Sequence, residues 1–134
     1  MKNKFMSVLS IVFICFLLLG TNVFAARKTV LLPSKQSWVA RTDTRTGDYY
    51  NVRSRLYAVY PTNGGKDNFE KIQVRVASTG ETIMSDVYTL NEKNSSNTTI
   101  PLKNGTLGNK HIRFQFRWNH PDYGATADVF YDGR

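Results

Sequence analysis

Arginines on predicted strands are the residues of this sequence best suited to binding chemistry. Arg53 and Arg55 are two residues apart, so an extended strand places both side chains on one side. Arg113 and Arg117 are four residues apart, which also places them on one side of a strand. Arg75 lies on a third predicted strand. Guanidinium groups bind phosphate and carboxylate through paired hydrogen bonds, so a sheet face carrying several of them would bind anions. The alternative is that these arginines only keep solvent-facing strand positions polar.

Exposed tyrosines would add stacking to such a surface. Tyr57 falls out of phase with the apolar positions of its strand, and Tyr123 follows a proline in a predicted turn. Rings at these positions could stack on sugars or bases, although core or cross-strand packing is the alternative role for each. The candidate ligand-binding residues are Arg53, Arg55, Tyr57, Arg75, Arg113, Arg117 and Tyr123.

The segment 118–124 is the other chemically dense part of the chain. It contains His120 and Asp122, a candidate metal-binding or acid–base pair. A zinc site needs three or four ligands, and His111 is the one further histidine, whereas the segment is also typical of a β-turn with a proline at its corner. No Gly-x-Ser-x-Gly turn or glycine-rich phosphate loop is present. We therefore expect no catalytic residues, no metal and no cofactor.

The first 25 residues have the pattern of a secretory signal peptide. Lys2 and Lys4 precede an apolar run from Phe5 to Leu19, and the small residue Ala25 follows where a signal peptidase would cleave. The run is about 15 residues, shorter than the roughly 20 that a membrane-spanning helix needs, so a retained anchor is the weaker alternative. We expect residues 1–25 to be removed and the remainder to be secreted.

Removal of this segment changes what the chain can do. The formal net charge of +8 falls to about +6, because Lys2 and Lys4 leave, and the single cysteine, Cys15, leaves as well. The mature chain then has no disulfide and no thiol nucleophile. At about 109 residues it is one domain, which its apolar core must stabilise alone. Its positive charge would concentrate acidic polymers nearby, whereas the absence of any recognised motif predicts no specific nucleic-acid binding.

Period-two alternation of apolar and polar residues predicts an all-β fold for residues 37–134. Strong patterns span 49–60, 69–78, 111–118 and 125–131, and weaker ones span 37–41, 82–90 and 98–102. The inward positions expected on the strong strands are Tyr50, Val52, Ser54, Leu56, Ala58 and Tyr60, then Ile72, Val74 and Val76, then Ile112, Phe114, Phe116 and Trp118, and finally Ala127, Val129 and Tyr131. The turn sequences at 62–65, 78–81 and 103–106 each contain glycine, which tolerates positive φ.

About seven short strands with one solvated face per sheet predict a small antiparallel β-sandwich or barrel. Residues 26–36 are expected to form an extended N-terminal arm before the domain. The function expected from this combination is a secreted, non-catalytic β domain that binds an anionic or carbohydrate polymer of the cell surface, such as a cell-wall polymer. A bacteriocin-like toxin that acts on other cells and an extracellular matrix or fibre subunit are the alternatives.

Overall fold

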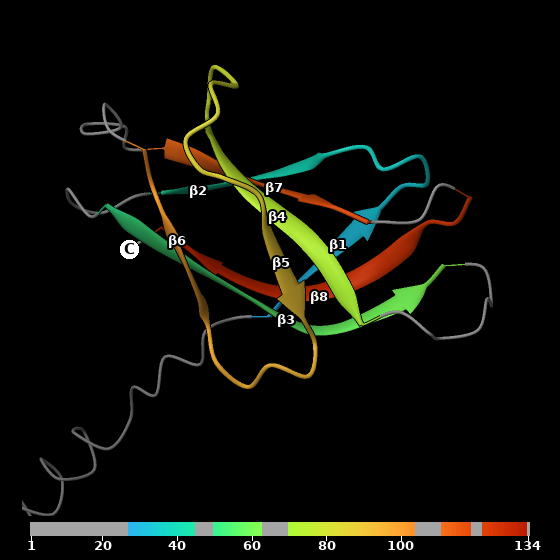
Figure 1. Ribbon diagram of the computed structural model, residues 1–134. Helices are drawn as coiled ribbons and strands as arrows, with labels where there is room; N and C mark the ends of the chain where they lie inside the picture. The colour runs from blue at the N-terminus through green and yellow to red at the C-terminus, as the bar shows by residue number, and fades with distance from the viewer. Residues whose placement is uncertain (1–26, 45–49, 63–69, 104–110, 119–121, 134) are drawn as a thin grey trace, which may run out of the picture.

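The computed structural model describes residues 27–44, 50–62, 70–103, 111–118 and 122–133, and every regular element within them is a β-strand (Figure 1). The strands are β1 (Lys28–Leu32), β2 (Val39–Thr44), β3 (Asn51–Pro61), β4 (Lys71–Ser78), β5 (Tyr88–Asn91), β6 (Thr98–Pro101), β7 (His111–Arg117) and β8 (Ala125–Asp132). The predicted signal peptide, residues 1–25, lies outside the described residues. Within the described part of the chain, no helix is long and apolar enough to cross a membrane.

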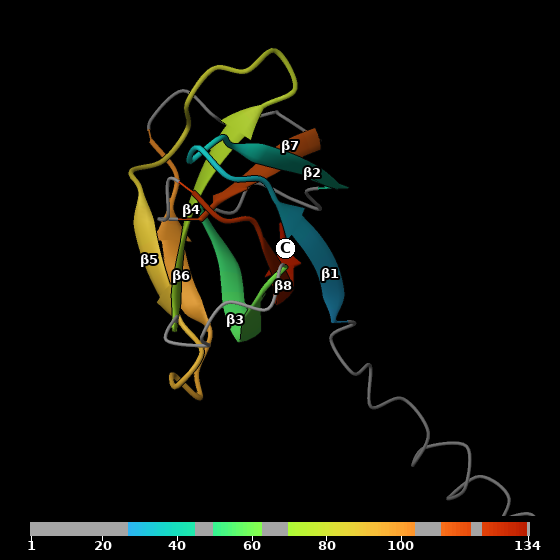
Figure 2. The same cartoon turned by 90° about the vertical axis from the view of Figure 1, so that its right-hand side faces the viewer.

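The strands form two four-stranded antiparallel sheets that pack face to face (Figures 1 and 2). Sheet A has the order β1-β8-β3-β6 and sheet B has the order β2-β7-β4-β5. Of the described strands that follow one another in sequence, β4 and β5 alone share a sheet, so every other connection passes from one layer to the other. The fold is a small β-sandwich, as the alternating pattern predicted.

The inward faces of the two sheets form the core. The inward positions predicted on β4 and β7 are all buried, and Trp118 just after β7 is buried with them. Three aromatic rings meet between the sheets: the ring centre of Tyr131 on β8 lies 5.1 Å from that of Phe114 and 5.7 Å from that of Phe116. Because this core fixes which residues of each strand face inward, it also fixes which side chains form the two outer faces.

A β-bulge in β3 changes which of its residues face the core. The pairing of β3 with β8 is regular up to Leu56 and resumes at Ala58, so Tyr57 is an extra residue. The alternation consequently shifts by one position, which buries Val59 and leaves Tyr60 50% exposed. The prediction that Tyr60 faces the core is therefore wrong, and Tyr50, which precedes the strand, is also exposed. A strict period of two cannot reveal an inserted residue.

Residues 28–32 belong to the sandwich and do not form an arm before it. Strand β1 pairs with β8 along its whole length at one edge of sheet A, and Val30 and Leu32 are buried in the core. The expectation of an arm over residues 26–36 is therefore wrong for residues 28–32, because five residues of alternation are too few to stand out in the sequence. At the opposite edge lies β6, which corresponds to the weak pattern over 98–102, and its last residue, Pro101, cannot donate a hydrogen bond to a further strand.

Candidate anion-binding site

The predicted arginines are divided between opposite faces of the sandwich. Arg53 and Arg55 lie on β3 in sheet A, whereas Arg75 lies on β4 and the pair Arg113 and Arg117 on β7 in sheet B. Buried residues alternate with these arginines along each strand, so the arginine side chains lie on the outer faces. The outer faces of the two packed layers point in opposite directions (Figure 2). The candidate residues therefore make up two surfaces.

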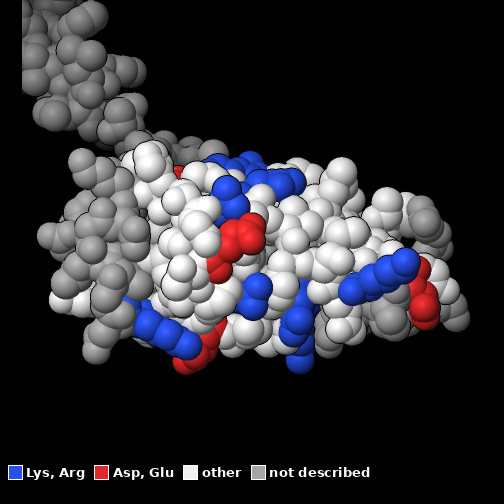
Figure 3. Space-filling model, turned by 90° about the horizontal axis from the view of Figure 1, so that it is seen from above, with Lys and Arg blue, Asp and Glu red and all other residues white. Residues whose placement is uncertain are grey.

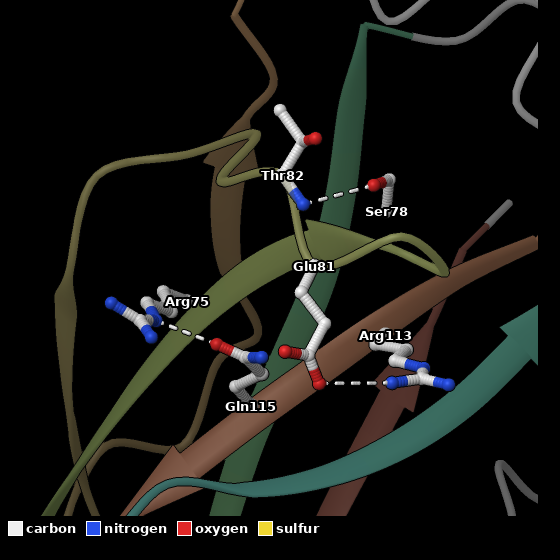
Figure 4. A network of polar contacts seen from close by, with 6 residues as sticks. All are labelled: Arg75, Ser78, Glu81, Thr82, Arg113 and Gln115. Carbon is white, nitrogen blue, oxygen red and sulfur yellow. Dashed lines mark hydrogen bonds and ion pairs between the residues drawn. The ribbon is translucent and has the colours of Figure 1, made fainter.

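Two of these arginines are paired with carboxylates. An Nη atom of Arg53 lies 2.9 Å from a carboxylate oxygen of Asp132, its cross-strand neighbour on β8. Nη1 of Arg113 lies 3.3 Å from Oε1 of Glu81, which reaches across from the turn after β4 (Figure 4). Solvent-exposed pairs of this kind add little stability, but each neutralises a cation that a ligand would otherwise meet.

Arg75 and Arg117 share one aromatic ring. Their guanidinium carbons lie 4.2 Å and 4.5 Å from the ring centre of Trp38. Trp38 immediately precedes β2, and because Val39 pairs with Phe116, the register places Trp38 beside Arg117. A guanidinium group over an indole ring is held by a cation–π interaction, and here two of them use the same ring.

Two glutamines hold the same guanidinium groups from the side. Nε of Arg75 donates to Oε1 of Gln115 at 2.7 Å (Figure 4), and Nε of Arg117 donates to Oε1 of Gln73 at 2.5 Å. Each glutamine is the directly paired residue on the neighbouring strand in the β4–β7 register. With Nε engaged, the terminal Nη groups are the part of each guanidinium available to a ligand. Neither arginine has a carboxylate partner among the described residues.

The two guanidinium groups repel each other. Partial burial and the neighbouring charge of Arg117 both lower the pKa of Arg75 from the ordinary arginine value. Arginine nonetheless stays protonated at neutral pH, so both positive charges persist side by side. An anion bound between them would remove this repulsion, so the site is electrostatically suited to phosphate or carboxylate.

Glu81, in the turn after β4, has an unfavourable backbone conformation. Its φ is 67°, in the left-handed region that glycine favours, so the positive φ of this turn falls on Glu81 and not on the preceding glycine. The Glu81 N–H donates to the Ser78 carbonyl (3.0 Å) and closes the turn. The Thr82 N–H also donates to Ser78 Oγ (3.1 Å), as Figure 4 shows. This conformation directs the carboxylate of Glu81 over β7, next to Arg113.

Basic side chains on the sheet B side form several separate patches, and acidic side chains lie beside some of them (Figure 3). The described basic side chains on this side therefore do not form one continuous positive surface (Figure 3). The local arrangement of the cations is for this reason a better guide to anion binding than the total charge. Trp38, Arg75 and Arg117 with Gln73 and Gln115 form a local group of cations that has no carboxylate partner where the structure describes the chain, and we call it the sheet B cluster.

The remaining candidates lie elsewhere. Tyr57 is on the outer face of sheet A, where guanidinium groups contact its ring, and Tyr123 lies between β7 and β8 and is 45% exposed. His120 is outside the described residues, so the candidate His120–Asp122 pair is not seen, and His111 is exposed at the start of β7. Where the structure describes the chain, no three His, Cys, Asp or Glu side chains are close enough to hold a metal ion.

Sequence reasoning missed Trp38, Gln73 and Gln115 as members of the site. Trp38 stands at the start of a weak strand pattern, and the two glutamines look like ordinary solvent-facing alternation. The available signal was that both glutamines occupy outward positions on strands that also carry outward arginines.

A scan against protein-family models found no match to the chain, and a search of curated proteins found no sequence with significant similarity. The inference of function therefore rests on the geometry of the site.

Proposed function

We propose that this protein is a secreted, non-catalytic β domain that binds an anionic cell-surface polymer through the sheet B cluster. The polymer class is a glycan whose units carry phosphate or carboxylate groups. The observation that carries the proposal is the pair Arg75 and Arg117, held over the ring of Trp38 without a carboxylate partner among the described residues.

The cluster is ordered before any ligand arrives. Stacking on Trp38 and the Nε hydrogen bonds to Gln73 and Gln115 restrict both guanidinium groups, so less side-chain entropy is lost on binding. A polymer presents many anionic groups along its length, and repeated weak contacts with one cluster raise the effective affinity. A repeating ligand suits a small site of this kind better than a single small anion does.

The chemistry of the cluster favours binding over catalysis. It consists of guanidinium, amide and indole groups, and none of these is a nucleophile or a general base at neutral pH. The pattern of residues 1–25 supports export of the domain, which would place the cluster where cell-surface polymers occur.

The proposal is tested by measuring the affinity of the purified protein for a polyol-phosphate polymer, a uronate polymer and an uncharged glucan. We expect binding to the charged polymers and not to the glucan. The variant R75Q/R117Q should bind the charged polymers at least tenfold more weakly. The matched control K71Q/K103Q, which removes the same charge from β4 and from the second residue after β6, should change affinity less than threefold. Equal losses in the two variants would show that overall charge, and not the sheet B cluster, is responsible.

Ionic strength and cell growth give two further readouts. Raising salt should weaken binding of the charged polymers, because screening acts on the contacts of the guanidinium groups, and unchanged binding would contradict an electrostatic site. Added to growing bacteria, a polymer-binding protein should leave their growth unchanged, whereas inhibition would favour the toxin alternative.

A further inference from the structure

The outer face of sheet A repeats the arrangement of guanidinium groups around an aromatic ring. The guanidinium carbons of Arg27 and Arg55 lie 4.2 Å and 4.8 Å from the ring centre of Tyr57. A third arginine, Arg53, is paired with Asp132 on the same sheet. Among the described residues, each side of the sandwich thus carries a ring with two guanidinium groups in contact with it and an arginine paired with an acid.

The fold brings the members of this second group together from distant parts of the sequence. Arg27 directly precedes β1, and Arg55 and Tyr57 lie on β3, with β8 between the two strands. Tyr57 is the extra residue of the β-bulge, so its presence on this face depends on the insertion that breaks the alternation of β3. Bulges commonly redirect one side chain at a functional site.

The charges of this second group are as little compensated as those of the sheet B cluster. Among the described residues neither Arg27 nor Arg55 has a carboxylate partner. Nε of Arg55 is buried and has no hydrogen-bond partner within the described part of the chain. An oxyanion would give the terminal Nη groups of both arginines negatively charged acceptors.

We infer that Arg27, Arg55 and Tyr57 form a second site for the same anionic polymer, so that one protein molecule links two polymer chains. This inference rests on the proposed function. The two sites lie on opposite outer faces, separated by two packed sheets whose backbones are about 10 Å apart, with side chains beyond them on both sides. A single polymer segment that lies along one outer face cannot also contact the opposite outer face. Two occupied faces therefore hold two segments.

Stoichiometry tests the second site. Calorimetric titration of the protein with a short anionic oligosaccharide cut from the bound polymer should give two ligands per molecule. R27Q/R55Q and R75Q/R117Q should each give one. A wild-type value of one, or a value for R27Q/R55Q equal to that of the wild type, would overturn the inference.

Crosslinking tests the consequence. Light scattering of the long polymer should rise at least tenfold at intermediate protein-to-polymer ratios and fall again when protein is in excess. R27Q/R55Q should bind the polymer without this rise. Y57L, which keeps both arginines and loses the ring, should reduce the rise at least threefold, and circular dichroism checks that both variants are folded.

Binding by the wild-type protein without crosslinking would refute the second site but would not contradict binding at the sheet B cluster. Full binding by R75Q/R117Q would instead refute the proposed function itself.

Discussion

Arg75 and Arg117 lie over the same indole ring from adjacent strands, at 4.2 Å and 4.5 Å from its centre. The contact with Trp38 and the hydrogen bonds of Nε oppose the mutual repulsion of the two charges. These contacts hold the two guanidinium groups in place, but no negative charge among the described residues neutralises them. This relationship, more than the number of arginines, distinguishes the sheet B surface.

Replacement of Trp38 should separate the positioning of the guanidinium groups from their charge. In W38L both arginines remain but lose their common platform, so we expect affinity for the charged polymer to fall about three- to tenfold and stability to fall by about 1 kcal/mol. Titration calorimetry and urea denaturation measure the two effects. W38F keeps a ring and should bind within about threefold of the wild type. Wild-type affinity in W38L would show that stacking does not organise the site.

Glu81 should compete weakly with an anionic ligand. Its carboxylate lies over β7 and pairs with Arg113 at 3.3 Å. E81Q removes this negative charge and should raise affinity for the charged polymer about two- to threefold, but it leaves the backbone strain of the positive φ unchanged. E81G should raise affinity similarly and also stabilise the fold by roughly 0.5–1 kcal/mol, because glycine tolerates the φ of 67°. Affinity is measured by titration and stability by thermal unfolding. A loss of affinity in both variants would instead make Glu81 part of the binding surface.

The sequence predicted the strands because alternation records which residues face the core. It could not predict the partner of each strand, since alternation contains no information about which sheet a strand joins. Nearly every connection crosses between the layers, and this separates Arg53 from Arg75 although each is an outward residue of a strong strand. The single arginine face suggested by the pattern consequently becomes two faces.

The composition of the sites was harder to predict than the fold. Trp38 acquires its role from the β2–β7 register, which places it beside Arg117, and no local sequence feature specifies that register. Tyr57 acquires its role from the β-bulge. The sequence does not reveal this bulge, because Ala58 is small and Tyr60 tolerates exposure, so both residues are compatible with facing either the core or the solvent. Long-range pairing therefore determined both sites.

Ser54 should be a structural residue, although it is polar and lies on the strand that carries Arg53 and Arg55. It is fully buried, and its hydroxyl donates to the Phe130 carbonyl at 2.8 Å. S54A removes this hydrogen bond in the core, so we expect a loss of about 1–2 kcal/mol in the free energy of unfolding, measured by urea denaturation. The exposed serine Ser37 is the control, and S37A should change stability by less than about 0.5 kcal/mol. An equal effect of the two substitutions would mean that the buried hydrogen bond adds no net stability.

Gly124 should be intolerant of any side chain because three segments converge on it. A Cβ atom there would lie 3.1 Å from the Leu32 carbonyl oxygen and 3.3 Å from Thr62 Oγ1, and the Gly124 carbonyl already accepts a hydrogen bond from the Thr62 N–H. G124A should therefore push the ends of β1 and β3 away from β8 and destabilise the fold by about 1–2 kcal/mol in thermal or urea unfolding. Gly80 provides the matched comparison, since a Cβ there would find its nearest neighbour, Ser78 Oγ, at an ordinary 3.8 Å. G80A should be neutral or stabilise by up to about 0.5 kcal/mol, because alanine restricts the unfolded chain. If G124A were as stable as G80A, the close approach of Leu32 and Thr62 would not constrain this end of the sandwich.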